Sequence, residues 1–423
     1  MNTLIFSSII IAVLVTLLLV VLLLWVKDRI TPSGTVKIDI NDGKRSLDVK
    51  QGGDILHTLA EEGIFLASAC GGKATCGQCK LQVTAGGGEI LDTEKVHFNR
   101  KQIKSGMRLG CQVKIKEDLK IQIPESTLSV KKLECEVISN ENVASFIKEF
   151  TVRLPEGEHL DFKSGEYIQI DVPKGVYNYK DIQISEAYKP TWERYGFFNL
   201  KCVNPEDTVR AYSMASYPAE GDIIKLNVRI ATPPFDPKAP KGSNKLLPVN
   251  PGIASSYVFS RKVGDKVTIS GPFGDFLLPE NDPLETEYIF VGGGAGMAPL
   301  RSHIMHLFRT LGTKRKVSFF YGARSLSEAF YLEDFWAIEK DFPNFKFYLT
   351  LDRPDPIADK QGVKYSAGFV APEMGRLYLN AHEAPEDIQY FMCGPPMLVK
   401  TVKDLLDSLG VDIENNLHFD DFG

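Results

Sequence analysis

Four of the seven cysteines in this 423-residue chain have the spacing of metal ligands. Cys70, Cys76 and Cys79 stand in a loop rich in glycine and alanine, and Cys111 completes the pattern C-x5-C-x2-C-x31-C. Four thiolates can hold a [2Fe–2S] cluster, and small neighbouring residues let backbone N–H groups approach its sulfurs. Zinc sites prefer two paired cysteine motifs or added histidines, so zinc and unmetallated core cysteines are the weaker alternatives. The spacing therefore predicts an iron–sulfur cluster.

The remaining cysteines and the nearby histidines are not expected to be ligands. Cys135 and Cys202 fall in predicted strands, and we expect both to be buried core thiols. Cys393 begins a CGPPM motif at the end of another predicted strand. His57 and His97 are expected to be surface or hydrogen-bonded residues. The predicted cluster therefore has an all-cysteine ligand set.

An Arg-x-Tyr-Ser element at Arg210, Tyr212 and Ser213 has the residue types that a flavin needs. A tyrosine ring can lie on the isoalloxazine, a serine hydroxyl can hydrogen-bond near its reactive edge, and an arginine can pair with the pyrophosphate. An isolated match of this kind is more often an ordinary strand. Two later motifs in matching order favour the flavin interpretation.

The first of these motifs is GIASSY at 252–257, followed by GPFG at 271–274. Gly252, Ser255 and Ser256 stand at a predicted helix start, where a glycine and hydroxyl groups suit phosphate oxygens. The three motifs together predict an FAD site.

A glycine-rich stretch, GGGAGMAP at 292–299, joins a predicted strand to a predicted helix. Glycines there let the backbone approach a pyrophosphate at the helix N-terminus, although Pro299 stands where a GxGxxG pattern has its third glycine. YGAR at 321–324 and CGPPM at 393–397 end two other predicted strands. Parallel sheets bind ligands at such strand ends, so these motifs predict a dinucleotide site. For Cys393 a buried structural thiol remains the alternative.

The predicted secondary structure differs between the segments that carry these motifs. Residues 34–128 and 130–283 contain short strands with turn punctuation, and the second segment is typical of an antiparallel barrel. Residues 284–423 alternate strands and helices, with one helix expected at 300–311. The predicted fold class is multidomain α+β and α/β. It comprises an N-terminal transmembrane helix, a β-grasp ferredoxin domain, an antiparallel flavin-binding β-barrel and a parallel α/β nicotinamide-binding domain.

Residues 4–26 carry no charge and are long enough to cross a bilayer as a helix. The basic start and small-residue cleavage site of a signal peptide are missing. Trp25 stands at interface depth, and Lys27 and Arg29 follow on the C-terminal flank. The sequence therefore predicts an uncleaved anchor with the rest of the chain in the cytoplasm.

The composition describes an ordinary globular chain. Hydrophobic residues make up 43% and charged residues 24%, which excludes wholesale disorder. The formal charge of −5 argues against a protein that binds nucleic acid through a basic face. We therefore expect no nucleic-acid partner.

From residue 130 onward, the RAYS, GGGAGMAP and CGPPM motifs resemble those of the ferredoxin–NADP⁺ reductase superfamily. The cysteine loop resembles that of adrenodoxin-like ferredoxins. With the anchor in front and the ending FDDFG at 419–423, the whole chain resembles the family of NADH-oxidising subunits of sodium-translocating NADH:quinone oxidoreductases.

This resemblance implies a role for each matching residue. The implied cluster ligands are Cys70, Cys76, Cys79 and Cys111. The implied FAD contacts are Arg210, Tyr212, Ser213, Gly252, Ser255 and Ser256. The implied NADH contacts are Gly294, Gly296, Met297, Arg324, Cys393, Gly394 and Pro395. The resemblance also implies that Cys393 and Ser213 lie beside the reacting atoms of nicotinamide and flavin.

The implied function is electron input. NADH gives a hydride, a [2Fe–2S] cluster accepts one electron at a time, and FAD must stand between them. The resemblance further implies partner membrane subunits that carry out ubiquinone reduction and sodium transport in a bacterial cytoplasmic membrane. A membrane-anchored reductase for an oxygenase or desaturase, and a membrane-tethered redox sensor, remain alternatives.

Three further expectations concern two long loops, the C-terminus and the choice of nicotinamide cofactor. Long stretches at 175–195 and 232–251 exceed usual loop lengths and are either partner-docking segments or surface insertions. Phe422 is expected to cover the flavin face where nicotinamide stacks, with packing against the last helix as the alternative. NADH is expected over NADPH, because Arg324 stands among acidic residues and Glu328 could accept from ribose hydroxyls.

Overall fold

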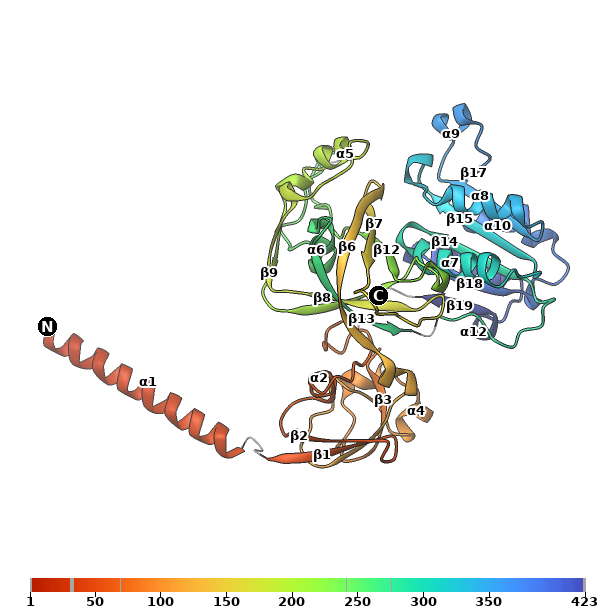
Figure 1. Ribbon diagram of the computed structural model, residues 1–423. Helices are drawn as coiled ribbons and strands as arrows, with labels where there is room; N and C mark the ends of the chain where they lie inside the picture. The colour runs from red at the N-terminus through yellow and green to blue at the C-terminus, as the bar shows by residue number, and fades with distance from the viewer. Residues whose placement is uncertain (1, 31–33, 69, 241, 275, 421–423) are drawn as a thin grey trace. The chain divides into compact units, whose positions relative to one another are not determined.

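The computed structural model describes residues 2–30, 34–68, 70–240, 242–274 and 276–420 (Figure 1). The chain divides into two compact units, Met1–Ser129 and Val130–Gly423.

The first unit begins with a single long helix, α1 (Asn2–Ile30). Its described apolar side chains, such as Phe6 and Leu18, are exposed. Within the described residues, no helix is long and apolar enough to cross a membrane.

A five-stranded mixed sheet follows, in the order β2-β1-β5-β3-β4. Its strands are β1 (Thr35–Ile40), β2 (Arg45–Lys50), β3 (Lys80–Ala85), β4 (Met107–Leu109) and β5 (Leu119–Gln122). The β1–β5 pair is parallel, and the other described pairs are antiparallel. Helix α2 (Ile55–Glu61) begins where the Asp54 carboxylate accepts from the His57 N–H. Its buried face packs on the sheet and closes the core of this unit.

Two short helices, α3 (Asp92–Lys95) and α4 (Arg100–Lys104), connect β3 to β4, and the 3₁₀ turn η1 (Glu125–Ser129) follows β5 at the end of this unit. A buried ion pair fixes β4, because the Arg108 guanidinium donates twice to Glu94 at 2.9 Å and also to the carbonyls of Gly87 and Gly88. The strand that leads into Cys111 is therefore held in one position.

The second unit begins with a six-stranded antiparallel sheet, in the order β11-β8-β13-β6-β7-β12. Its strands are β6 (Lys131–Ala144), β7 (Ile147–Arg153), β8 (Tyr167–Val172), β11 (Thr208–Ser213), β12 (Ile223–Arg229) and β13 (Lys266–Phe273). A bridge between Met214 and Leu226 joins the two edge strands, β11 and β12. Helix α6 (Ile253–Ser260) packs on this sheet and buries Tyr257 and Phe259.

The stretch at 175–195 is a packed part of this domain. It forms β9 (Gly175–Asn178), the turn η2 (Tyr179–Asp181) and α5 (Lys189–Arg194). β9 pairs with β10 (Lys201–Asn204) in a separate two-stranded sheet, and the turn η3 (Phe197–Asn199) precedes β10. Trp192 is fully buried, and its indole N–H donates to the Ser145 carbonyl at 2.7 Å. In the stretch at 232–251, Phe235 and Leu246 form a single bridge, and Phe235 stays exposed.

The rest of the second unit is a six-stranded parallel sheet, in the order β17-β16-β15-β14-β18-β19. Its strands are β14 (Tyr288–Gly293), β15 (Val317–Ala323), β16 (Phe345–Leu351), β17 (Ser366–Ala367), β18 (Gln389–Cys393) and β19 (Leu417–Asp420). Alternate side chains of β14 point to opposite faces: Phe290 packs with α7 (Met297–Met305) and α8 (Leu332–Asp341), and Val291 packs with α10 (Val370–Leu377) and α11 (Pro396–Ser408). Helices therefore cover both faces (Figure 1).

One helix of this domain differs from the sequence-based expectation at both of its ends. The helix expected at 300–311 starts earlier, as α7, and ends in a π-helical turn, η6 (His306–Thr310). The start is earlier because the 3₁₀ turn η5 (Gly294–Gly296) continues without a break into α7. Further short elements complete this domain: η7 (Leu326–Glu328), α9 (Pro356–Gln361), η8 (Leu379–Ala381), η9 (Pro385–Asp387) and α12 (Ile413–Asn416). In the flavin domain, the turn η4 (Pro218–Glu220) lies between β11 and β12.

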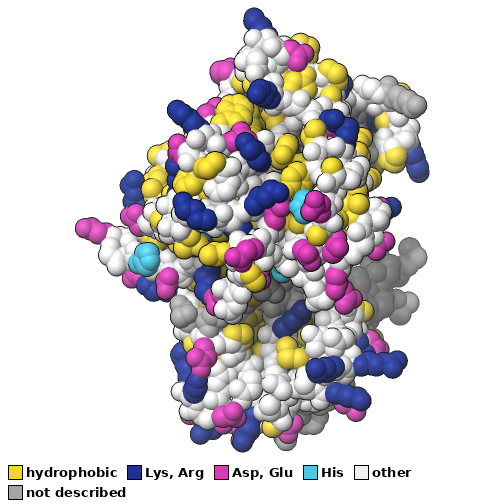
Figure 2. Space-filling model, turned by 90° about the vertical axis from the view of Figure 1, so that its right-hand side faces the viewer, with side chains coloured by type: hydrophobic (Ala, Val, Ile, Leu, Met, Phe, Trp, Pro, Cys, Tyr) yellow, Lys and Arg dark blue, Asp and Glu magenta, His cyan; other side chains and the backbone are white. Residues whose placement is uncertain are grey.

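On the face drawn in Figure 2, basic and acidic side chains are interspersed. Both signs stand side by side there, as the nearly balanced composition of 49 basic and 54 acidic residues leads one to expect.

Candidate redox site

The four cysteines of the predicted cluster site meet in two pairs. The Sγ atoms of Cys70 and Cys76 are 3.3 Å apart. The thiol of Cys79 is hydrogen-bonded to that of Cys111, which follows β4 in the chain. Across the described residues, no group of three or more His, Cys, Asp or Glu side chains is placed to hold one metal ion. A two-iron cluster with bridging sulfides needs two thiolates at each iron, and two thiol pairs fit that donor set.

The environment of each pair favours one thiolate. Burial raises the pKa of Cys70, but hydrogen bonds with Cys76 and Thr75 outweigh it and lower the pKa to about 6. The hydrogen bond with Cys79 lowers the pKa of Cys111 to about 6. The same hydrogen bond, together with burial, raises the pKa of Cys79. Since thiolates are the form that binds metal, the loop is electrostatically suited to a cationic centre.

Glycines in the loop make room for two histidines. Gly77 has φ +65°, and a Cβ there would lie 2.5 Å from the Nδ1 of His97. The His97 ring is 2.8 Å from the Ala74 carbonyl through Nε2, and Gly72 similarly faces His57. His97 is thus a hydrogen-bonded support of the loop, as expected, and His57 is bonded to Asp54 at 2.7 Å.

The flavin motif lies on β11, at the edge of the antiparallel sheet. Tyr212 packs against the core, and Ser213 ends the strand as a buried residue. The Ser213 hydroxyl donates to the Asp420 carboxylate at 2.7 Å. Asp420 stands opposite Cys393 in the register of β19 with β18. The end of the flavin motif and the end of the CGPPM strand are therefore brought together.

Arg210 lies on the same strand, three positions before Ser213. Its guanidinium donates to the Thr208 hydroxyl at 3.0 Å and to the Val209 carbonyl at 2.7 Å. Among the described residues these partners are local and neutral, so the charge of Arg210 is available to an anionic group.

The second flavin motif begins α6, with Gly252 as its N-cap. The Ser255 hydroxyl is hydrogen-bonded to backbone groups: it accepts from the Ala231 N–H and donates to the Gly252 carbonyl, each at 3.1 Å. Ser256 is fully buried and bonds to the Tyr179 hydroxyl at 2.9 Å. The Ser256 side chain is therefore bonded within the core of the domain.

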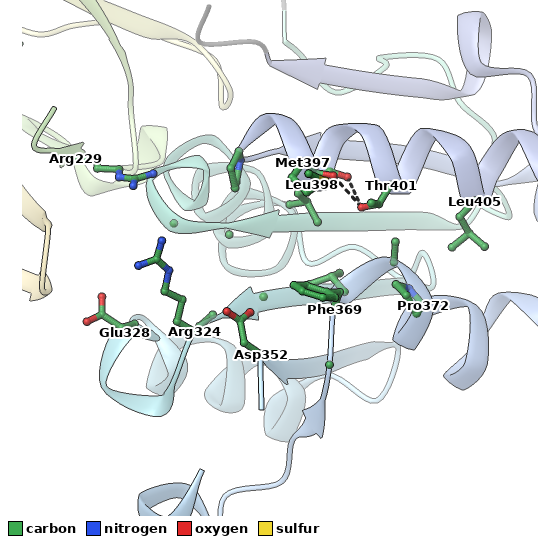
Figure 3. Close-up of a pocket in the computed structure, with 18 of the residues that line it drawn as sticks. Arg229, Arg324, Glu328, Asp352, Phe369, Pro372, Met397, Leu398, Thr401 and Leu405 are labelled. Atoms are coloured by element: carbon green, nitrogen blue, oxygen red, sulfur yellow. Dashed lines mark hydrogen bonds between the residues drawn. The ribbon is translucent and has the colours of Figure 1, made fainter. Parts of the chain in front are cut away.

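A cleft of about 780 Å³ opens at the carboxyl ends of the parallel strands (Figure 3). It contains Gly294 of the glycine-rich turn, Arg324 at the end of β15 and Pro395 before α11. These three predicted contacts come from different parts of the chain and lie in one cavity. The cleft therefore has the position expected of a dinucleotide site in a parallel sheet.

Charged side chains gather at one end of the cleft. Figure 3 shows Arg324 and Arg229 near Glu328 and Asp352, whereas Phe369 and Leu398 line the other part. Glu328 accepts from the Ser145 backbone N–H at 3.2 Å and from the Ser145 hydroxyl. The charged end can bind a polar ribose and phosphate, and the apolar part can hold a ring.

Four predicted NADH contacts lie outside this cavity. Gly296 packs against β18, since a Cβ there would lie 2.4 Å from the Cys393 carbonyl oxygen. Met297 and Cys393 are fully buried, and the position of Gly394 faces the Leu398 side chain. Met297 points into the core because it lies on the face of α7 that packs on the sheet. Gly296 is therefore needed for close helix–strand packing.

Sequence reasoning missed several residues of the site. Asp352, Phe369 and Met397 line the cleft, and Asp420 meets Ser213. Asp352 directly follows a predicted strand, and this position could have identified it. Asp420 has no such signal, since its partner is 207 residues away in sequence.

Comparison with protein families finds three matches along the chain. It matches the 2Fe-2S iron-sulfur cluster binding domain over residues 38–116. It matches the oxidoreductase FAD-binding domain over 192–277 and the oxidoreductase NAD-binding domain over 290–404. These matches confirm the predicted cofactor set of [2Fe–2S], FAD and NADH.

Solved structures of low sequence identity share the fold. An Amycolatopsis cytochrome P450 reductase superposes with a TM-score of 0.61 at 22% identity, covering 92% of this chain and 99% of that one. The ferredoxin reductase in carbazole 1,9a-dioxygenase gives a TM-score of 0.56 at 20% identity, covering 93% and 99%. Fold and site together define an NAD-linked iron–sulfur flavoprotein oxidoreductase.

Close relatives identify the family within that class. The F subunit of the Na(+)-translocating NADH-quinone reductase of Pseudoalteromonas atlantica is 47% identical over 410 residues, covering 97% of each chain. The protein of the same name from Haemophilus ducreyi is 48% identical over 423 residues, covering 100% of this chain and 99% of that one. The chain belongs to this family of F subunits of Na(+)-translocating NADH-quinone reductases, which confirms the resemblance drawn from its motifs.

Proposed function

We propose that this chain oxidises NADH and passes the electrons singly to partner subunits of a sodium-translocating quinone reductase. The observation that carries the proposal is the hydrogen bond of 2.7 Å between Ser213 and Asp420. It joins the strand of the flavin motif to the strand that lies beside Cys393. When bound, FAD converts the two-electron hydride of NADH into the single electrons that a [2Fe–2S] cluster accepts.

The proposed division of labour follows the segments of the sequence. Residues 34–128 hold the cluster through the four cysteines, residues 130–283 hold FAD, and residues 284–423 bind NADH. The thiol pairs, the β11 motif and the strand-end cleft support this assignment, because each supplies the donors that its cofactor needs.

Ser213 and Asp420 have a joint role in this proposal. The Asp420 carboxylate accepts a hydrogen bond from the Ser213 hydroxyl, so the lone pairs of the Ser213 oxygen are turned away from that carboxylate. Ser213 is thereby oriented as an acceptor toward a group at the end of β11. Cys393, Tyr212 and Arg210 complete the flavin and nicotinamide surroundings, with Gly252 and Ser255 at the start of α6.

The NADH contacts proposed from the sequence divide into two groups. Gly294, Arg324 and Pro395 line the cleft and can touch the cofactor directly. The others shape the strand ends from behind: Gly296 packs on the Cys393 backbone, Gly394 faces the Leu398 side chain, and Met297 and Cys393 are buried. Phe422, proposed to cover the flavin, lies outside the described residues.

We further propose that residues 4–26 anchor the chain as a single transmembrane span in a bacterial cytoplasmic membrane, with the soluble domains in the cytoplasm. The 23-residue uncharged run within a continuous helix supports this, as does the exposure of its described apolar side chains. Ubiquinone reduction and sodium movement then belong to the partner subunits.

Stopped-flow reduction of FAD by NADH tests the proposal. Ser213→Ala is expected to keep FAD bound and to lower the rate constant for its reduction, on the order of 10- to 100-fold, since a positioned group is lost. Ser260→Ala is the matched control, because that hydroxyl has local partners, the Tyr257 carbonyl and the neighbouring Arg261. Unchanged flavin reduction in Ser213→Ala would contradict the proposed site.

The same measurement tests the proposed role of Phe422. Phe422→Ala is expected to change the rates with NADH and NADPH without changing cluster content.

A further inference from the structure

We propose that Arg301 and Ser302 are positioning residues that set the distance between the flavin motif and the glycine-rich turn. Both belong to α7, the helix that begins directly after that turn. The inference rests on the proposed placement of FAD at β11 and of NADH at the turn.

The two side chains hold the end of the flavin motif by its backbone. Arg301 Nη1 donates to the Ala215 carbonyl at 2.8 Å, and the Ser302 hydroxyl donates to the Ser216 carbonyl at 2.7 Å. Ala215 and Ser216 directly continue β11, two and three residues after Ser213. Residues 301–302 of one domain are thus bonded to residues 215–216 of the other.

Carboxylates on both sides fix the guanidinium. Arg301 is 4% exposed, its Nε is 2.9 Å from Asp334 and its two terminal nitrogens are each 3.3 Å from Glu220. Glu220 belongs to the flavin domain and is also bonded to Lys225 at 2.8 Å, whereas Asp334 belongs to α8 of the nicotinamide domain. The arginine therefore bridges the two domains in a geometry with few alternatives.

A tyrosine beside the guanidinium ties the bridge to two more strands. The Arg301 guanidinium lies 4.8 Å from the centre of the Tyr331 ring. The Tyr331 hydroxyl donates to Glu149 on β7 and accepts from the Asn227 side chain on β12 at 2.8 Å. Tyr331 has φ +62°, a left-handed conformation that a tyrosine rarely adopts.

A buried ion pair of this kind is a poor source of stability, because desolvation offsets much of the attraction. It is better suited to specifying one arrangement of the groups that it joins. Hydride transfer is sensitive to such arrangement, since a shift of about 1 Å between reacting groups can cost ~100-fold in rate.

The test uses the full chain loaded with FAD and compares Arg301→Met, Arg301→Lys and Ser302→Ala with the wild type. Arg309→Met is the control, because Arg309 follows α7 in the chain and forms an exposed ion pair with Asp341. The measurements are FAD content, the dissociation constant of NAD⁺, the midpoint of thermal unfolding and the rate constant for flavin reduction per bound FAD. Amide hydrogen exchange of segment 211–217 in FAD-free protein gives a readout that does not depend on activity.

Arg301→Met is expected to lower the rate constant per bound FAD by about 10- to 100-fold, with NAD⁺ affinity unchanged and exchange at 211–217 accelerated. Arg301→Lys keeps the charge but loses the fork of donors, so it should restore the unfolding midpoint more fully than the rate constant. Ser302→Ala is expected to lower the rate constant by about 3- to 10-fold, as for one lost hydrogen bond.

Equal rate constants per bound FAD in all three variants would overturn the inference, whatever happens to thermal stability. If Arg301→Met fails to fold, Arg301→Lys and Ser302→Ala decide the question by the same criterion. Failure of the FAD placement itself would be recognised separately, because Tyr212→Ala would then retain full FAD content.

Discussion

At the scale of single residues, the thiols of the cysteine loop differ in depth. Cys79 and Cys111 are nearly inaccessible, whereas Cys76 of the outer pair is partly exposed. Cys76 can therefore be altered with little disturbance of the core. All four lie in the unit Met1–Ser129, and the flavin and nicotinamide motifs lie in the other unit.

Cys76→Ala is expected to abolish the EPR signal of the reduced [2Fe–2S] cluster, because one iron loses a thiolate ligand. Reduction of FAD by NADH should continue, since it takes place in the other unit. Cys135→Ala, which alters a buried thiol of the flavin domain, should keep the EPR signal. Stoichiometric zinc without labile sulfide in anaerobically purified protein would contradict the cluster.

The charges at the polar end of the cleft predict a preference for NADH. A 2′-phosphate adds about two negative charges, and Glu328 and Asp352 line the same cavity as Arg324. Asp352→Asn is expected to raise kcat/KM for NADPH by about 3- to 10-fold with little change for NADH. Asp404→Asn, elsewhere in the lining of the cleft, is the control and should leave the ratio unchanged. Equal kcat/KM values for both cofactors in the wild type would refute the prediction.

Lys148 gives the flavin domain a pH-dependent stability. It is 1% exposed, its ammonium donates to the Asn140 carbonyl at 3.0 Å, and burial lowers its pKa from 10.5 to about 8. The folded state therefore binds fewer protons than the unfolded state between these values, so this residue makes stability rise from pH 8 to 10.5.

Lys148→Met is expected to stabilise the domain at pH 7, by up to about 3 kcal/mol, and to remove this rise. The measurement is the difference in unfolding midpoint between variant and wild type, followed by release of FAD at about pH 7 and about pH 10, on either side of the lowered pKa. The exposed Lys266→Met should show a flat difference. A difference for Lys148→Met that does not shrink with pH would count against the buried charge.

At the scale of elements, the stretch at 175–195 is part of the core of the flavin domain. Its turn η2 and helix α5 bury Tyr179 and Trp192 in an aromatic cluster with Phe259, so this stretch is more than a tolerated loop. Its outer side, including Val176, remains exposed. A docking role for that side stays a prediction.

Trp192→Ala is expected to destabilise the flavin domain by about 3–5 kcal/mol, because a fully buried indole and its hydrogen bond are lost. Trp336→Ala, on α8, removes the same side chain from a position that is 37% exposed. Urea unfolding followed by FAD fluorescence compares the two variants. Similar unfolding midpoints would mean that the stretch contributes little to the core.

At the scale of the whole molecule, the chain combines an apolar helix with domains that have their own cores. The clusters around the mixed sheet and the antiparallel sheet are built from local strands and helices, and one cluster of the parallel sheet also takes in Ala144 of β6 and Ile147 of β7. Among the residues that the structure describes, none from α1 belongs to any of these cores. Removal of α1 should therefore leave the folded domains intact.

A truncated chain that starts at residue 34 is expected to be soluble, to bind FAD and to reduce ferricyanide with NADH. It should fail to restore quinone reduction when added to membranes that lack the full chain, because the tether supplies a high effective concentration at the partner subunits. The full chain added in the same way is the control. Full restoration by the truncated chain would show that the helix is dispensable.

The sequence alone determined those features that depend on residues close together in the chain. The cysteine spacing, the RAYS and GGGAGMAP motifs and most strands could be predicted, because turn and alternation signals act over a few residues. The buried state of Cys135 and Cys202 was likewise predicted correctly from their strands. The cofactor set follows from these local signals.

Only the tertiary structure decided which distant residues meet. The sequence could not show that Asp420 contacts Ser213 or that Arg301 holds Ala215, because long-range contacts depend on how sheets and helices pack rather than on local preference. It placed Met297 at the cofactor, whereas the packing of α7 turns Met297 inward and leaves Met397 to line the cleft. The local sequence indicates where a helix starts. Which of its side chains can reach a ligand depends on which face of the helix is buried against the sheet.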